Sequence, residues 1–293
     1  MPPCPRRGRR TRMYEAFYNL KEPPFGSTPD PRFLYRSQGH REALAYVAYG
    51  LFGKKGFLAL TGEVGIGKTT VIRAFVHTFH PCLEVAFVLN TNVNFEEMLY
   101  LILQDFGMDV QDTSKVRMLS QLNSFLIDRF ALHQNPVIVI DEAQNLAAEV
   151  LEELRLLSNL ETDRQKLVQI VLVGQPELAE VLKRQSLRQL RQRIPGVLHM
   201  KNLQPREVDE YIRFRLRTAG MTNGALAFTP EAQGAIYAYS DGIPRLINTL
   251  CDRVLIRGCL RHETTIGRDM VEASVLELEG GMAERWNDAG GMG

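Results

Sequence analysis

The sequence has 293 residues, of which 45% are hydrophobic and 24% charged, with 35 Lys and Arg against 34 Asp and Glu. This balance excludes an intrinsically disordered, collagen-like or disulfide-stapled chain, and the four cysteines form no C-x-x-C pair. The length fits one large domain or two small ones, and no apolar run reaches the roughly 18 residues of a transmembrane helix. We therefore expect a globular protein of the reducing cytoplasm.

The charge is unevenly distributed along the chain. Residues 1–12 contain five arginines and no acid, and without these arginines 30 basic residues face 34 acidic ones, a formal charge of −4. Such a basic arm could bind nucleic acid or acidic lipid. It could also be a disordered extension that precedes a second start at Met13, and we favour this interpretation. No apolar stretch follows the arm, so it is not a secretory signal.

Short apolar runs rich in β-branched residues alternate with helical patterns over residues 13–204, which predicts a parallel sheet covered by helices. The five predicted strands share nearly continuous apolar character and span residues 56–61, 83–90, 136–141, 167–174 and 197–203. The predicted helices fill the gaps, at residues 38–53, 68–80, 94–106, 114–133, 147–159 and 176–192. We expect a three-layer α/β core.

The strand signals stop after Pro205. Periodic segments at residues 205–219, 230–239, 243–257 and 267–279 predict an all-α domain, which we interpret as a lid. Residues 280–293 are rich in glycine and predict a flexible tail.

A phosphate-binding loop lies between the first strand and the helix that follows it. Its sequence matches G-x-x-x-x-G-K-[ST] and comprises Gly62, Glu63, Val64, Gly65, Ile66, Gly67, Lys68 and Thr69, with Thr70 next. Glycines allow the tight turn that directs backbone N–H groups at an anion on a helix N-terminus. Lys68 can then neutralise the β and γ phosphates, and the Thr69 hydroxyl can ligate Mg²⁺. An incidental glycine turn is the competing interpretation.

Two acids, Asp141 and Glu142, end the third apolar strand. Side chains at the carboxyl end of a parallel strand face the crevice where ligands of open α/β sheets bind. Asp141 is placed to hold the Mg²⁺ shell, and Glu142 can orient or deprotonate an attacking water. The alternative is that both acids cap the next helix, because acids favour helix N-termini.

Polar amides end two further strands. Gln175 would project into the same crevice and could contact the γ-phosphate or the water. Asn90 could hydrogen-bond Glu142 and hold it inactive. Turns also place Asn and Gln at such positions for local reasons, so the role of Asn90 stays open at this stage.

Arginines could complete the site from elsewhere. Arg188, Arg191 and Arg193 lie in a segment that is either a solvated helix face or the source of an arginine finger for a neighbouring subunit. Arg245 follows Pro244 near the start of a lid helix and could reach back to the nucleotide. A structural ion pair is the alternative for Arg245.

Together these motifs resemble those of AAA+ ATPases, and most of all the ATPase domain of the general secretion pathway protein A (ExeA/GspA) type. The resemblance covers residues 13 to about 279 and includes the motifs MYEAF, TGEVGIGKTT, DEAQNL, LVGQPEL, LRQLRQRI and GIPRLINTLCDR. ATPases of exosortase-linked exopolysaccharide loci look similar over the same span. Transposition ATPases of the TniB/MuB type look similar more distantly.

The resemblance implies a role for each matching position. Residues 62–70 would be Walker A, Asp141 and Glu142 Walker B, Gln175 sensor 1 and Arg245 sensor 2. Arg191 or Arg193, with Arg188 still possible, would be the trans finger, and residues 25–40 would line the adenine side. The implied cofactors are ATP and Mg²⁺, and the implied partners are further copies of the chain in a ring or filament.

The chain departs from the secretion type at its end. It stops at Gly293 without the transmembrane segment and peptidoglycan-binding region that follow the ATPase domain in those relatives. We therefore expect a stand-alone member in the cytoplasm or at the periphery of the inner membrane, acting on secretion, envelope or polysaccharide-export proteins. Two alternatives remain: a nucleotide-gated docking module with little turnover, and an ATP-dependent, filament-forming DNA-binding regulator. The acidic body makes DNA the weaker choice.

Overall fold

The computed structural model describes residues 14–26, 30–79, 82–162, 165–222 and 226–289. The chain forms two compact units: one spans Arg36–Lys201, and the other combines the residues up to Tyr35 with those from Asn202 onward. The predicted arm, residues 1–12, lies outside the described residues.

The first unit is built on a parallel five-stranded sheet in the order β2-β3-β4-β1-β5. Its strands are β1 (Phe57–Thr61), β2 (Leu83–Val88), β3 (Asn135–Ile140), β4 (Gln169–Gly174) and β5 (Val197–His199). The order places β4 between β1 and β3, and the register sets Thr61 beside Gly174. The carboxyl ends of these three strands therefore meet at one edge of the sheet.

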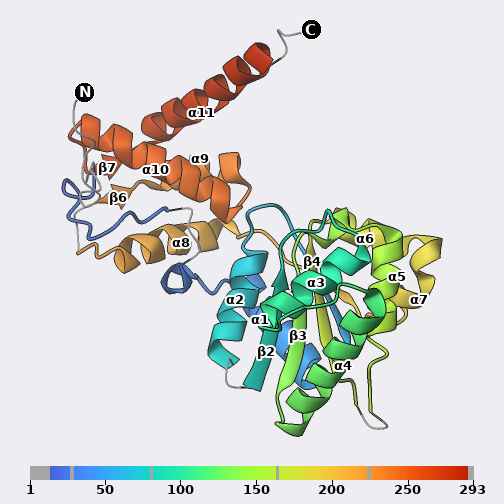
Figure 1. Cartoon of the computed structure of the whole chain (residues 1–293). Helices are drawn as coiled ribbons and strands as arrows, with labels where there is room; N and C mark the ends of the chain where they lie inside the picture. Colours follow the sequence, from blue (N-terminus) through green and yellow to red (C-terminus); the bar gives the residue numbers. More distant parts are fainter. Residues whose placement is uncertain (1–13, 27–29, 80–81, 163–164, 223–225, 290–293) are drawn as a thin grey trace, which may run out of the picture. The chain divides into compact units, whose positions relative to one another are not determined.

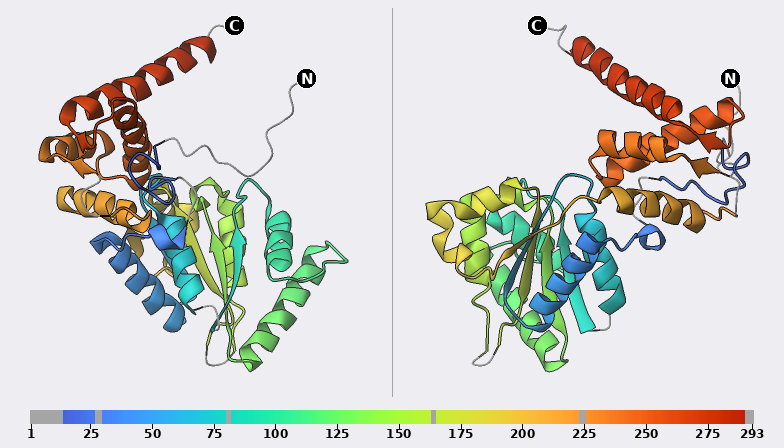
Figure 2. Two further views of the ribbon diagram at one scale, coloured as in Figure 1. Left: turned by 90° about the vertical axis from the view of Figure 1, so that its left-hand side faces the viewer. Right: turned by 180° about the vertical axis from the view of Figure 1, so that it is seen from behind.

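Helices cover both faces of this sheet. Figure 2 (left) shows α1 on one side and α4 on the other. The helices of this unit are α1 (Gln38–Phe52), α2 (Lys68–Phe79), α3 (Phe95–Asp105), α4 (Lys115–Ala131), α5 (Ala148–Leu157), α6 (Glu177–Lys183) and α7 (Arg188–Arg191), with 3₁₀ turns η3 (Ala143–Asn145) and η4 (Gln185–Leu187). The predicted three-layer α/β core is confirmed.

Alternation along the strands creates the two apolar layers. Ile138 and Ile140 of β3 pack with α3, α4 and α5, whereas Val137 and Val139 pack with α1 and α2. Successive strand side chains point to opposite faces, so a strand that is buried on both faces must be apolar at every position. This requirement explains the uninterrupted apolar runs in the sequence.

The second unit is mainly helical. Its helices are α8 (Pro205–Thr218), α9 (Pro230–Ser240), α10 (Pro244–Leu260) and α11 (Arg268–Ala289), with a 3₁₀ turn η1 (Pro31–Phe33). The prediction of an all-α lid needs one addition, because β6 (Ala227–Phe228) pairs with β7 (Thr265–Ile266). Figure 1 shows α11 continuing past the other helices of its unit.

The last helix is longer than the sequence predicts. The sequence predicts its end near residue 279, but α11 continues to Ala289, and residues 290–293 lie outside the described part of the chain. The flexibility of the tail stays a prediction. Among the described residues, no helix combines the length and apolar character that crossing a membrane requires.

The predicted domain boundary differs from the compact units. The sequence predicts residues 14–35 in the α/β core, but Tyr14, Tyr18, Phe25 and Phe33 are buried in one apolar cluster with α8, α9 and α10. Burial and the Asp252 carboxylate, to which its hydroxyl donates, raise the pKa of Tyr14 above its ordinary value. Tyr14 therefore stays a neutral donor in this core.

Candidate functional site

The phosphate loop connects β1 to α2 and turns at two glycines with left-handed backbone angles, φ +85° at Gly65 and +104° at Gly67. Lys68 begins α2 and is only 6% exposed. Its Nζ donates to the carbonyl oxygens of Gly62 at 2.7 Å and Glu63 at 3.1 Å. The loop therefore curls around a buried ammonium group at the N-terminus of a helix, where the helix dipole also favours an anion.

Thr69 and Asp141 meet across two elements. Thr69 lies in the first turn of α2, and Asp141 follows the last residue of β3. The Thr69 hydroxyl donates to Asp141 Oδ2 at 2.6 Å. Asp141 is 8% exposed. A hydroxyl and a carboxylate are hard oxygen donors of the kind that Mg²⁺ prefers, so these two residues fit the predicted metal site.

Glu142 leaves the strand with a strained backbone. Its φ of 53° and ψ of 38° lie in the left-handed region, which a residue with a side chain rarely adopts. Its N–H donates to Asp141 Oδ1 at 3.0 Å, and its carbonyl accepts from the Thr91 hydroxyl. Strained backbone of this kind gathers at functional sites.

Two amide side chains hold the Glu142 carboxylate. Its Oε2 accepts from Gln144 Nε2 at 2.7 Å and from Gln175 Nε2 at 3.0 Å. Gln175 follows β4, which lies between β1 and β3, so the sheet order brings it to the edge where Asp141 and Glu142 end β3. The structure thus gathers Asp141, Glu142 and Gln175, as the sequence predicts.

Gln144 also belongs to this group of side chains, although the sequence patterns do not predict it. This residue bridges Glu142 and the backbone N–H of Gln175, which donates to Gln144 Oε1 at 3.0 Å. The sequence feature that points to Gln144 is its position, two residues after the acid Glu142.

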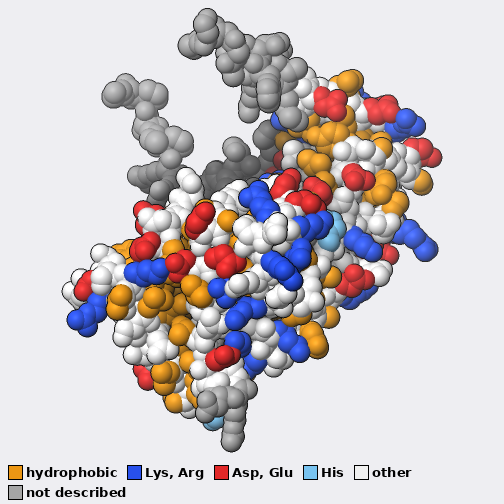
Figure 3. Space-filling model, turned by 90° about the vertical axis from the view of Figure 1, so that its right-hand side faces the viewer, with side chains coloured by type: hydrophobic (Ala, Val, Ile, Leu, Met, Phe, Trp, Pro, Cys, Tyr) orange, Lys and Arg blue, Asp and Glu red, His pale blue; other side chains and the backbone are white. Residues whose placement is uncertain are grey.

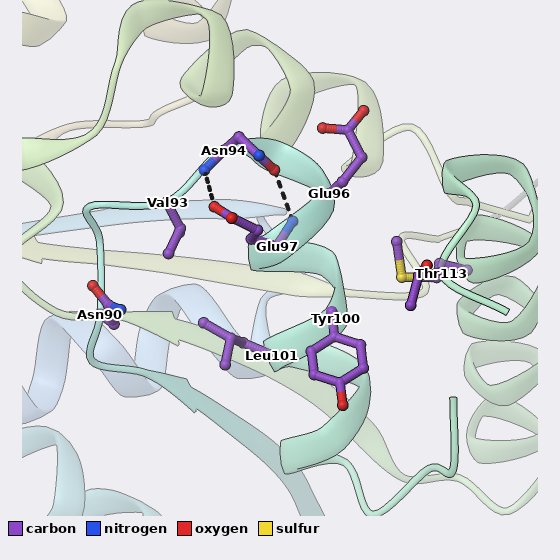
Figure 4. A pocket seen from close by; sticks show the side chains of 9 residues that line it. Asn90, Val93, Asn94, Glu96, Glu97, Tyr100, Leu101 and Thr113 are labelled. Atoms are coloured by element: carbon purple, nitrogen blue, oxygen red, sulfur yellow. Dashed lines mark hydrogen bonds between the residues drawn. The ribbon is translucent and has the colours of Figure 1, made fainter. Parts of the chain in front are cut away.

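Asn90 makes a local turn instead. Its Oδ1 accepts from the N–H of Asn92 at 3.2 Å, and the residue lines a cavity of about 510 Å³ with Val93, Tyr100 and Leu101 (Figure 4). The predicted restraint of Glu142 by Asn90 stays a prediction.

The arginines of residues 188–193 differ in their surroundings. Arg193 is half-buried, and its Nη1 donates to Ser158 Oγ at 3.0 Å, whereas Arg188 and Arg191 are exposed. Figure 3, viewed from the side on which Figure 1 places α7, shows basic side chains gathered on this face. Arg245 is exposed in the first turn of α10, and its role stays a prediction.

The predicted adenine-side segment is divided between the two units. Phe25 and Phe33 belong to the apolar cluster of the helical unit, and residues 27–29 lie outside the description. His40 belongs to the first unit and is buried there, and its Nδ1 lies 2.6 Å from Ser37 Oγ. A β-carbon added to Gly67 would lie 3.1 Å from His40 Nε2, so this histidine sits against the phosphate loop.

Residues 53–182 match the family model of the AAA domain. The sequence is 42% identical to general secretion pathway protein A of Aeromonas hydrophila over 269 residues, which cover 92% of this chain and 49% of that protein. The chain therefore spans about half the length of this relative.

Solved structures show the same fold at low identity. The Aeropyrum pernix ORC2 protein aligns with a TM-score of 0.67 and 20% identity over 88% of this chain and 72% of its own. Cdc6p of Pyrobaculum aerophilum aligns with a TM-score of 0.67 and 18% identity, over 90% of this chain and 70% of its own. A RuvB mutant of Thermotoga maritima aligns with a TM-score of 0.52 and 19% identity, over 83% of this chain and 69% of its own. The chain thus has the AAA+ P-loop NTPase fold, matches the AAA domain model over residues 53–182 and is similar in sequence to general secretion pathway protein A.

Proposed function

We propose that this protein binds ATP and hydrolyses it in a Mg²⁺-dependent reaction. The observation that carries the proposal is the hydrogen-bonded arrangement beside the phosphate loop, in which Thr69 contacts Asp141 and Gln175 contacts Glu142. A P-loop without an aligned acid could bind nucleotide, but hydrolysis also needs a group that activates water.

Each residue has a chemical task in this reaction. Lys68 and the loop N–H groups bind the β and γ phosphates. Thr69 and Asp141 would hold Mg²⁺, which supplies positive charge against the phosphate oxygens. Glu142 accepts a proton from the attacking water, and the Gln175 amide donates to that water or to the γ-phosphate.

Replacing Glu142 tests hydrolysis separately from binding. We expect Glu142→Gln to bind ATP with nearly unchanged affinity while turnover falls by roughly 10²–10⁴-fold, because the amide cannot take the proton. Phosphate release and binding of a fluorescent ATP analogue are measured together. The control is Glu180→Gln, the same change at an exposed acid of α6. Wild-type protein without phosphate release would refute the proposal.

Replacing Lys68 tests the loop itself. We expect Lys68→Ala to lose ATP binding as well as turnover, because the phosphates lose their principal cation. Binding that stays at the wild-type level would place the nucleotide elsewhere.

We further propose that Arg188 or Arg191 completes the site of a neighbouring copy. Both are exposed, and Arg191 Nη1 donates only at 3.5 Å to the carbonyl oxygen of Lys183, whereas Arg193 is half-buried and its Nη1 donates to Ser158 Oγ at 3.0 Å. We expect Arg188→Ala or Arg191→Ala to lower turnover by about 10³-fold with ATP binding retained, as for arginine fingers in general. Light scattering with and without ATP reports assembly in the same samples. Normal turnover in both variants would exclude these two fingers.

The process that we propose for the turnover is assembly of a secretion, envelope or polysaccharide-export complex, from the cytoplasm or the periphery of the inner membrane. The name of the Aeromonas hydrophila relative supports this choice. Phosphate release with and without purified envelope proteins tests it, and stimulation is the expected result.

DNA binding remains the alternative. Arg215 is buried, whereas Arg213, which pairs with Asp209, and Arg217 are exposed, so α8 presents two of its three neighbouring arginines to solvent. A salt-sensitive gel shift by the protein without residues 1–12 would favour DNA over an envelope partner.

A further inference from the structure

The Gln144 side chain connects two parts of the site that are distant in sequence. Its Nε2 donates to Glu142 Oε2 at 2.7 Å, and its Oε1 accepts the backbone N–H of Gln175 at 3.0 Å. A backbone N–H can only donate, so it requires the oxygen of the amide, and the NH₂ group must then face the carboxylate. Both ends of Gln144 are thereby fixed in orientation.

Gly174 leaves the space in which the Gln144 side chain makes this contact. A β-carbon added at Gly174 would lie 2.7 Å from Gln144 Oε1, and 3.0 Å from atoms of Leu178. The last residue of β4 therefore leaves room for the Gln144 side chain. The strained backbone of Glu142 turns the chain so that η3 brings Gln144 back toward β4.

We propose that Gln144 is a positioning residue that orients the Glu142 carboxylate and couples it to the Gln175 loop, an inference that rests on the proposed ATP hydrolysis. Glu142 Oε2 accepts from two amides. When the Gln175 amide turns to a phosphate oxygen or a water, Gln144 still holds Oε2. The carboxylate therefore keeps its direction at the moment when the water must be activated.

The first variant is Gln144→Met, which keeps the length of the side chain and removes both hydrogen bonds. We expect kcat to fall by roughly 10- to 100-fold, the effect of losing one hydrogen bond to a charged group, with KM for ATP unchanged. A purely structural role would change KM or the amount of folded protein instead. The control is Gln104→Met, the same change at an exposed residue of α3.

A second readout needs no turnover. The Gln175 N–H donates to Gln144 Oε1, so its hydrogen exchange, measured without added nucleotide, should be at least about tenfold faster in Gln144→Met. The second variant, Gln144→Glu, separates the two ends of the contact. Its carboxylate still accepts from the Gln175 N–H but repels Glu142, so exchange should stay slow while kcat falls.

The outcomes distinguish this inference from the proposed function. Absence of phosphate release by wild-type protein defeats the proposed function, whereas the exchange result still tests the Gln144 contact. Unchanged kcat in both variants overturns the positioning role. A raised kcat also overturns it, because Gln144 would then be a brake, and so does unchanged exchange in Gln144→Met.

Discussion

Gly67 shows how strongly one residue shapes the phosphate loop. Its φ of +104° belongs to a region that side chains rarely adopt, and an added β-carbon would press against His40 Nε2. His40 has little freedom to move away, because it is buried and its Nδ1 contacts Ser37 Oγ. Backbone strain and crowding therefore act at the same position.

We expect Gly67→Ala to lower the free energy of unfolding by about 1–3 kcal/mol and to weaken ATP binding, because the loop must leave its native angles. Urea unfolding and nucleotide titration measure the two effects. The control is Gly196→Ala, where an added β-carbon meets nothing within 4 Å. Equal effects of the two substitutions would contradict the argument.

A capping box closes the start of α3. Asn94 Oδ1 accepts from the N–H of Glu97, and Glu97 Oε2 accepts from the N–H of Asn94, both at 2.9 Å (Figure 4). This capping box satisfies two backbone donors that the first turn of a helix leaves without partners. It also fixes the chain between β2 and α3, where Asn90 and Thr91 lie.

Removing the cap should cost about 1 kcal/mol of stability, so we expect Asn94→Ala to unfold at lower urea concentration. The exposed Asn92 lies outside the capping box, and Asn92→Ala should change stability by less than about 0.5 kcal/mol. A larger loss in Asn92→Ala than in Asn94→Ala would refute this account of the helix start.

Strands and most helices followed from periodicity, but one predicted helix did not. Residues 176–192 form α6, η4 and α7, because Leu182 and Leu187 both pack into the same core. In a continuous helix, two side chains five positions apart point in directions that differ by about 140°. Both leucines therefore reach the core only if the helix is interrupted between them. Arg184, with ψ of 143°, provides the break, and no glycine or proline marks it in the sequence.

Some residues of the candidate site can be predicted from the sequence, and others cannot. Lys68, Thr69, Asp141 and Glu142 were predictable because each lies in a short motif tied to a strand end. The role of Gln144 depends on the spacing between β3 and β4 and on the space left by a glycine, which are properties of the folded sheet. The sequence shows Gln144 and Gly174, but not that the folded sheet brings them together.

At the scale of the whole molecule, two segments that are distant in sequence form one unit, because Tyr14, Tyr18, Phe25 and Phe33 pack with the helices that follow Asn202. Arg215 of α8 is 8% exposed and donates to the carbonyl oxygens of Pro24 at 2.6 Å and Gly26 at 3.1 Å. Its guanidinium also lies over the Phe33 ring, 4.6 Å from the centroid. One buried cation thus ties the start of the chain to its final third.

We expect Arg215→Ala to destabilise the helical unit by roughly 2–4 kcal/mol, because two carbonyl groups lose a charged donor and an aromatic ring loses its cation. Hydrogen exchange should quicken in α8 and residues 14–26 and stay unchanged in the five-stranded sheet. Arg213→Ala, which removes an exposed ion pair on the same helix, should cost about 0.5 kcal/mol or less. Equal losses of stability in Arg215→Ala and Arg213→Ala would contradict the structural role of Arg215.

This discontinuous unit has a consequence for synthesis on the ribosome. Tyr14, Tyr18 and Phe25 leave the exit tunnel long before α8 is translated, since the whole of Arg36–Lys201 comes between them. Translation proceeds at about 5–20 residues per second, so the residues against which these aromatic side chains pack are synthesised on the order of ten seconds or more later. During that interval the nascent chain displays an apolar N-terminal segment to chaperones, while the unit of residues Arg36–Lys201 can already fold.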